Sequence, residues 1–127
     1  MYGESYEIKQ EDRAQIEALR AHIESNCAEP VTIARLARFA HMSPTKLKFC
    51  FRLVCGSTIH AYVSQSRVEK AKRLIRETEI PLHAIAAMVG YQKPSAFSAA
   101  FRKVTGVRPS EYRKTAAEAP AWERARC

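Results

Sequence analysis

Residues 43–56 read SPTKLKFCFRLVCG, and residues 93–106 read KPSAFSAAFRKVTG. At an offset of 50 the two stretches share a proline, a phenylalanine, an arginine, a valine and a closing glycine. The proline stands at the first helical position, where its missing N–H group costs nothing, and the glycine suits the end of a helix. Each stretch therefore predicts one short amphipathic helix with a defined start and end.

A second apolar pattern precedes each of these helices. Its members recur at helical spacing, namely Ile33, Leu36, Ala37 and Ala40 in the first copy and Leu82, Ile85, Ala86 and Val89 in the second. A tight turn joins the two helices of each copy, with Gly90 at the point where the backbone needs a left-handed residue and His41 at the equivalent point. Two short helices joined by such a turn form the helix-turn-helix pattern, whose second helix can enter a DNA major groove.

The rest of the chain also has helical periodicity, and no segment alternates in the manner of a strand. A helix is expected from Glu11 to just before Pro30, a long one over 58–77 and a short last one from Pro109. The polar side of the long helix carries Arg67, Lys70, Lys72, Arg73 and Arg76. The fold class is thus all-α, with two helix-turn-helix subdomains, a linker helix and about seven helices. The expected segments are an N-terminal tail or linker over 1–13, the first subdomain over 14–57, the linker helix over 58–78, the second subdomain over 79–115 and a flexible tail over 116–127.

The positive charge is concentrated in the middle of the chain. Residues 30–115 hold 16 basic and 4 acidic side chains, a net charge of +12, whereas residues 1–29 hold 3 basic and 7 acidic ones. The whole chain of 127 residues has a net charge of +8. Such a bias indicates a polyanionic partner, most often nucleic acid, because a surface that faces phosphates needs many cations.

Several other classes of protein are disfavoured. Cys27, Cys50, Cys55 and Cys127 form no Cys-x-x-Cys pair, so neither a zinc site nor a disulfide framework is expected. No catalytic triad, carboxylate pair or phosphate-binding glycine loop indicates an enzyme, and no cofactor is expected. The chain has no apolar run long enough for a membrane span and no secretory signal, which predicts a cytoplasmic protein.

These features together resemble the DNA-binding domain of the AraC/XylS transcription regulators. The resemblance covers about residues 14–114 and is carried by the two units, the basic helix between them and a closing signature. That signature consists of Ile85-Ala86, Gly90-Tyr91, Phe97-Ser98, Phe101-Arg102-Lys103, Gly106, Pro109-Ser110 and Tyr112-Arg113.

The resemblance implies a monomeric unit that inserts two recognition helices into successive major-groove faces on one side of double-stranded DNA. The linker helix would set their separation at about one helical turn, roughly 34 Å, so the site is asymmetric and not a palindrome. Members of this family usually activate transcription by contacting RNA polymerase. No membrane partner is implied.

Helical geometry divides the two recognition helices into base-facing, phosphate-facing and core residues. The positions expected nearest the base edges are Thr45, Lys48, Phe49, Ser95, Ala96, Ser98 and Ala99. The positions better placed for phosphates are Lys46, Arg52, Lys93, Arg102 and Lys103. The positions expected inward are Leu47, Phe51, Phe97, Phe101 and Val104, with Tyr62 and Tyr112 as core residues that keep a solvated hydroxyl.

Two positions depart from the family pattern. Family members commonly carry arginine where this chain has Phe49, and again where it has Ala99. The contact of arginine with guanine is the commonest specific base contact. Neither helix can make this contact from these two positions in this chain. Phe49 then either touches thymine methyls or packs sideways into the core.

Two alternatives to DNA binding remain open at this point. A degenerate copy of the fold would use Phe49 and the small residues of the second helix as an apolar surface for a protein partner. A thiol sensor would use Cys50 and Cys55, although residues five apart on a helix do not share a face.

Overall fold

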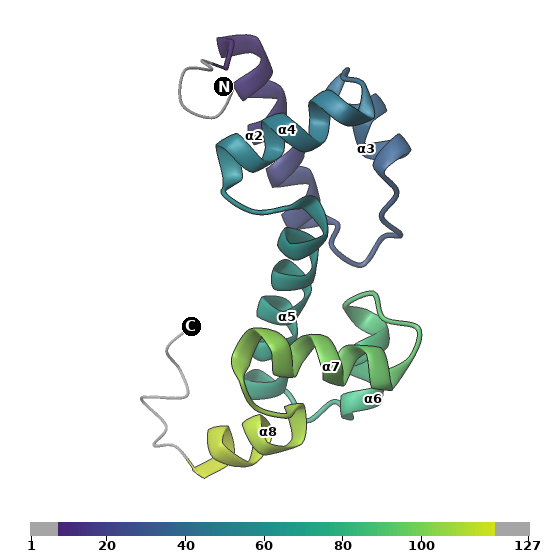
Figure 1. Cartoon of the computed structure of the whole chain (residues 1–127). Coiled ribbons are helices and arrows are strands. Elements are labelled where there is room, and N and C mark those ends of the chain that lie inside the picture. The colour runs from purple at the N-terminus through teal and green to yellow at the C-terminus, as the bar shows by residue number, and fades with distance from the viewer. Residues whose placement is uncertain (1–7, 119–127) are drawn as a thin grey trace. The chain divides into compact units, whose positions relative to one another are not determined.

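The computed structural model describes residues 8–118, and this part of the chain contains seven helices and no strand (Figure 1). In chain order they are α2 (Gln10–Ser25), α3 (Ile33–Ala40), α4 (Pro44–Cys55), α5 (Ile59–Glu77), α6 (Leu82–Met88), α7 (Pro94–Thr105) and α8 (Pro109–Glu118). The all-α fold with two helix-turn-helix pairs is therefore confirmed.

The helices form two units, and the boundary falls within α5. The first unit holds the residues up to Asn26 together with Pro30–Val63, and the second holds Cys27–Glu29 together with the residues from Ser64 onward. Each unit has a core of its own, to which α5 contributes from one of its halves. The first core includes Ile16, Leu19, Leu47, Phe51, Ile59 and Val63, and the second includes Val68, Ala71, Ile75, Ile85, Phe97 and Phe101.

Capping residues define the ends of the helices in the first unit. The Thr32 hydroxyl accepts a hydrogen bond from the Arg35 N–H at 3.3 Å, which caps α3. The Ser43 hydroxyl accepts one from the Lys46 N–H at 3.2 Å, which caps α4. Gly56 has a φ of 78° and ends α4, because a residue without a Cβ adopts the left-handed conformation at little cost.

The turns of the two helix-turn-helix pairs have matching geometry. His41 has a φ of 56° and Gly90 a φ of 110°, so both positions adopt the positive φ expected there. In each turn the N–H group after this residue donates back to the helix, from Met42 to the Ala37 carbonyl (3.0 Å) and from Tyr91 to the Ala86 carbonyl (2.9 Å). The internal repeat thus extends from the sequence to the backbone hydrogen bonds.

The helices extend further than expected at both ends of the described chain. α2 begins at Gln10, one residue before the helix start expected at Glu11, so residues 10–13 of the segment assigned to a tail or linker are helical. α8 extends through Glu118, so residues 116–118 are helical as well, because no proline or glycine interrupts the chain before Pro120. The remainder of the predicted tail, residues 119–127, lies outside the described residues.

The prediction that Val104 points into the core is wrong. Its side chain is 40% exposed, whereas Phe97 and Phe101 on the same helix are buried. Val104 lies in the last turn of α7, just before the glycine that ends the helix. Apolar periodicity gives the face of a helix, but burial also requires another element to cover that face, and this last turn is not covered.

Candidate nucleic-acid interface

The recognition helix of the first unit, α4, buries one side and exposes the other. Leu47, Cys50 and Phe51 are fully buried and hold the helix on the first core. Beyond Pro44, the side chains that remain exposed are those of Thr45, Lys46, Lys48, Phe49, Arg52 and Leu53. The outward side of α4 therefore combines three cations, one hydroxyl and two large apolar groups.

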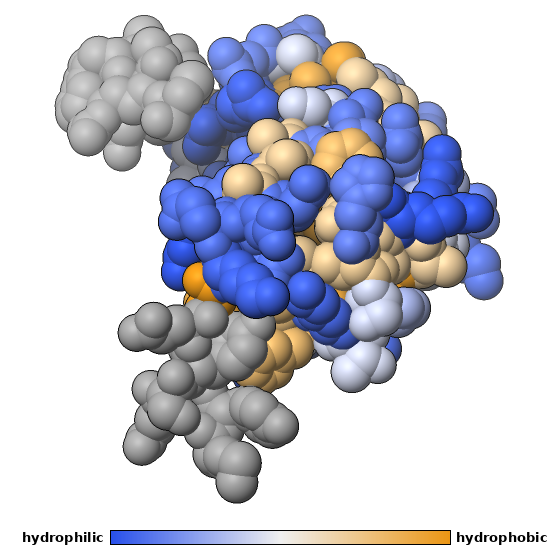
Figure 2. Space-filling model, turned by 90° about the horizontal axis from the view of Figure 1, so that it is seen from above, coloured by the Kyte–Doolittle hydropathy of each residue, from blue (hydrophilic) through white to orange (hydrophobic). Residues whose placement is uncertain are grey.

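The recognition helix of the second unit, α7, has the same division. Phe97 and Phe101 point into the second core. The exposed residues on and beside the helix include Lys93, Ser95, Ala96, Ser98, Ala99, Arg102, Lys103 and Val104. All the residues that the sequence predicts to contact DNA are thus exposed on α4, on α7 or at the start of α7. Figure 2 shows one face of the molecule on which hydrophilic side chains alternate with smaller apolar areas.

The two recognition helices differ at their first residues. Ser43 caps α4 with its side chain, whereas Lys93 stands at the equivalent position of α7 and makes no side-chain cap. The outward side of α7 has basic groups at both ends, because Lys93 precedes its first turn and Arg102 and Lys103 are in its last turn. Between these ends the outward side of α7 carries only small side chains.

Phe49 does not pack into the core. Its side chain is 36% exposed, although its neighbours Cys50 and Phe51 are fully buried. Leu53, one helical turn further along, is 39% exposed and continues an apolar stripe on the outward side of α4. Leu53 is not among the predicted contact residues, although its spacing of four residues from Phe49 places it on the same side of the helix.

An acidic residue of α2 also reaches the start of α4. The Lys46 Nζ atom lies 3.2 Å from the Asp12 Oδ2 atom, and the Asp12 side chain is only 10% exposed. Asp12 is the one buried charged residue in the part of the chain that the structure describes. Asp12 is not among the predicted site residues, because nothing in the sequence pairs α2 with the first turn of α4.

Part of the basic side of α5 is used to hold the second unit together. The Arg67 guanidinium donates to the carbonyls of Cys27 at 2.6 Å and Glu29 at 3.2 Å, and lies 5.1 Å from the centre of the Tyr91 ring. Arg76 donates to the Tyr112 hydroxyl at 2.7 Å. These two arginines therefore have structural partners, although the sequence assigned them only to a polar surface.

Burial of Cys55, the last residue of α4, disfavours thiolate chemistry there. Burial raises the pKa of the Cys55 thiol, and the nearby Arg20 guanidinium only partly opposes this effect. Burial, together with the hydrogen bond that its hydroxyl donates to Glu24, raises the pKa of Tyr62 to about 12. A raised pKa disfavours the thiolate, which is the nucleophilic form of the thiol, so it counts against a thiol sensor at Cys55.

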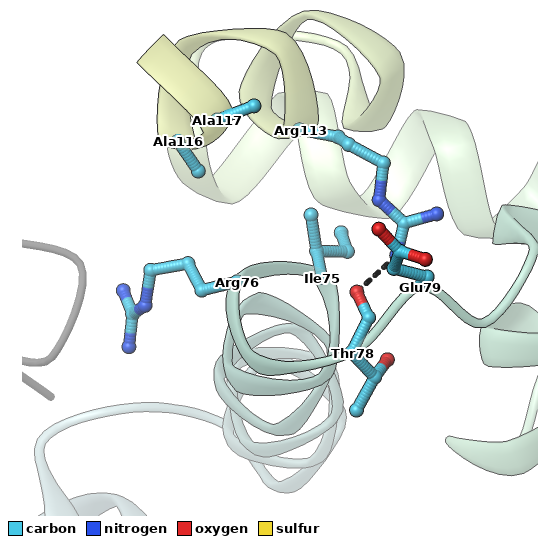
Figure 3. A pocket seen from close by; sticks show the side chains of 7 residues that line it. All are labelled: Ile75, Arg76, Thr78, Glu79, Arg113, Ala116 and Ala117. Atoms are coloured by element: carbon cyan, nitrogen blue, oxygen red, sulfur yellow. Dashed lines mark hydrogen bonds between the residues drawn. The ribbon is translucent and has the colours of Figure 1, made fainter. Parts of the chain in front are cut away.

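The second unit contains a pocket of about 460 Å³ away from the recognition helix. Its lining comes from the end of α5, the following loop and α8, namely Ile75, Arg76, Thr78, Glu79, Arg113, Ala116 and Ala117 (Figure 3). The Arg113 guanidinium crosses from α8 to donate to the carbonyls of Thr78 at 3.3 Å and Ile80 at 2.7 Å. Arg113, one of the charged residues at this pocket, thus links α8 to the loop after α5.

Neither a metal site nor a membrane span is found among residues 8–118. No group of three or more histidine, cysteine, aspartate or glutamate side chains gathers there in a way that could hold a metal ion. None of the helices in this range combines the length and the apolar character that crossing a membrane requires.

Comparison with known proteins identifies the family. A family model described as a helix-turn-helix domain matches residues 36–115, which include both recognition helices. A putative AraC-like transcription regulator of Streptomyces antibioticus is 41% identical over 83 residues, which are 65% of this chain and 27% of that protein. The chain belongs to the AraC family of transcription regulators.

Two other comparisons extend over more of the chain. The probable transcriptional regulator LumQ of Photobacterium leiognathi is 30% identical over 107 residues, 84% of this chain and 43% of that protein. The DNA-binding domain of the transcriptional factor AdpA, solved in complex with a target DNA, has a TM-score of 0.76 and 26% identity over 80% of this chain and 91% of that chain. This AraC-family chain spans less than half the length of either curated relative.

Proposed function

We propose that the chain binds double-stranded DNA sequence-specifically and regulates transcription, with α4 and α7 in two successive segments of the major groove. The observation that carries the proposal is the matched pair of 12-residue helices, each with a buried apolar side and an exposed outward side that carries cations. Membership of the AraC family supports it, as does the net charge of +12 in residues 30–115.

The exposed residues that the sequence predicts to contact DNA fall into two groups in this proposal. Base edges are contacted by Thr45, Lys48 and Phe49 in the first unit and by Ser95, Ala96, Ser98 and Ala99 in the second. Phosphates are contacted by Lys46, Arg52, Lys93, Arg102 and Lys103. The phosphate contacts set register and affinity, whereas the base contacts carry the sequence information.

The two units are expected to contribute unequally to sequence discrimination. Lys48 is the one long cation at a proposed base-contacting position, so it supplies the guanine preference of α4 through O6 and N7. Phe49 and Leu53 add apolar area that suits thymine methyl groups. The hydroxyls and methyls of α7 discriminate weakly, so this helix contributes mainly phosphate affinity and readout of DNA shape.

One chain is proposed to occupy an asymmetric site of about two helical turns, because a single chain supplies both recognition helices. The proposed outcome of binding near a promoter is activation through contact with RNA polymerase.

The salt dependence of binding tests the proposal. About six phosphate contacts predict a slope of log K against log salt concentration of about −5, because each contact contributes about −0.9. The measurement is a fluorescence-anisotropy titration of random and selected duplexes at several salt concentrations. A slope shallower than about −2 would contradict DNA binding. Such a shallow slope would favour the alternative function, in which the outward sides of α4 and α7 bind a protein.

A further inference from the structure

Asp12 is in an unusual environment for a carboxylate. It lies in the first turn of α2, and the residue is only 7% exposed. A carboxylate withdrawn from water is stable only with a compensating partner. Among the described residues, the cation within ion-pair distance of its Oδ2 atom is Lys46, at 3.2 Å.

Lys46 is held at both of its ends. Its backbone N–H group donates to the Ser43 hydroxyl at the start of α4, and its ammonium group contacts Asp12 on a different helix. The Lys46 side chain is nevertheless 45% exposed, so it is not enclosed by this pair. A phosphate approaching the start of α4 can therefore reach the cation that Asp12 already engages.

This ion pair differs from the other ones in the described chain. The pairs Arg20–Glu17, Lys72–Glu69 and Arg108–Glu111 each link residues three apart in the sequence, and their acidic side chains are 51%, 56% and 58% exposed. The Asp12 carboxylate is 10% exposed and joins α2 to α4. Solvent screens a charge pair less when one partner is buried, so the Asp12–Lys46 attraction is stronger than that of the surface pairs.

We propose that Asp12 competes with DNA phosphate for Lys46 and so limits the phosphate affinity of the first recognition helix. The inference rests on the proposed function, since it concerns the same DNA surface. When Lys46 moves to a phosphate, the buried Asp12 carboxylate loses part of its compensation. The phosphate contact of Lys46 is therefore weaker than that of an equally exposed cation without a buried acidic partner.

A cycle of variants measures this competition. Asp12→Asn keeps the shape of the side chain and removes its charge, and Glu11→Gln is the matched control because it removes the same charge from the adjacent exposed residue. Lys46→Ala is combined with each background, and the affinity for random duplex DNA is measured at several salt concentrations.

Asp12→Asn is expected to bind random duplex about three- to tenfold more tightly and to steepen the salt slope by up to about 0.9, the value of one phosphate contact. Lys46→Ala should weaken binding in every background, and several-fold more in Asp12→Asn than in the wild type or in Glu11→Gln. If Lys46→Ala lowered the affinity for DNA by the same factor in all three backgrounds, the proposed competition would be wrong. A wild type that binds no duplex would contradict the proposed function instead.

A second measurement uses the unmodified chain and does not depend on the folding of a variant. The carboxyl carbon resonance of Asp12 is followed by NMR while random duplex is added, with that of Glu11 as the reference. The Asp12 resonance should shift as DNA saturates the protein, because its cation moves to a phosphate. A DNA-bound protein in which Asp12 is unshifted would show that Lys46 stays on the carboxylate.

Discussion

At the residue scale, the environments of two equivalent turn positions decide which side chain each one tolerates. His41 has a left-handed backbone but is exposed. Gly90 has a positive φ, and two other residues, Ala28 and Arg67, also lie close to it. A Cβ atom there would lie 2.9 Å from the Ala28 Cα atom and 3.0 Å from the Arg67 guanidinium. The second turn therefore requires glycine for two reasons, whereas the first has only the backbone cost of a non-glycine residue.

Substitutions at these two turns should have unequal effects. Gly90→Ala is expected to lower the free energy of unfolding of the second unit by about 2 kcal/mol or more, because backbone strain adds to the contact with Ala28. His41→Gly should change the stability of the first unit by less than about 1 kcal/mol, since relief of strain offsets the greater freedom of the unfolded chain. Amide hydrogen exchange reports the two units separately. If both substitutions lowered the free energy of unfolding by similar amounts, the contact with Ala28 would not be what makes Gly90 necessary.

At the scale of elements, α4 and α7 have the same length, and each begins with a proline and is followed by a left-handed glycine. Their exposed side chains are chemically different. The outward side of α4 carries Lys46, Lys48 and Arg52 beside an apolar stripe, whereas the middle of α7 carries only small residues. Two repeated helices can pack in the same way and still differ in the DNA sequence they prefer. The buried side of each helix determines its packing, whereas the exposed side determines recognition.

Arginine placed at the two departures from the family pattern should create guanine preferences. Ala99→Arg is expected to add one in the half of the site bound by α7, and Phe49→Arg one in the half bound by α4, each of about 1–3 kcal/mol. Neither variant should lose much stability, since both positions are exposed. Selection of bound sequences and thermal melting are the measurements. A stable Ala99→Arg variant with unchanged preference would show that α7 enters the groove with a different rotation.

At the scale of the whole molecule, both recognition helices belong to one chain, and their surroundings carry the positive charge. The net charge of residues 30–115 is +12, and each unit has its own core. Each unit is thus a separate scaffold for one recognition helix, which agrees with an internal repeat of 49–50 residues.

Stoichiometry and footprinting test the use of both helices by a single chain. One molecule per minimal site is expected, with two protected major-groove segments about one turn apart on one face of the DNA. Analytical ultracentrifugation of the complex gives the number of chains, and hydroxyl-radical cleavage gives the protected segments. Two chains per minimal site would mean that each chain uses only one recognition helix.

Much of the fold was predictable from local signals in the sequence. Ser43, Pro44 and Gly56 mark the ends of α4 because capping and backbone preferences act over a few residues. The periodicity of Phe97 and Phe101 gives the buried side of α7 for the same reason. The outward positions of both recognition helices then follow from helical geometry, which explains why the predicted DNA-contacting residues are all exposed.

By itself the sequence determined the helices, their repeat and the charge that indicates a nucleic-acid partner, because each depends on residues close together in the chain. Only the tertiary structure decided that Phe49 and Val104 are exposed, since burial depends on what covers a helix face. It also decided that Asp12 lies against Lys46, 34 residues away in the sequence. Long-range charge pairs of this kind arise from the packing of α2 against α4, and no local pattern contains them.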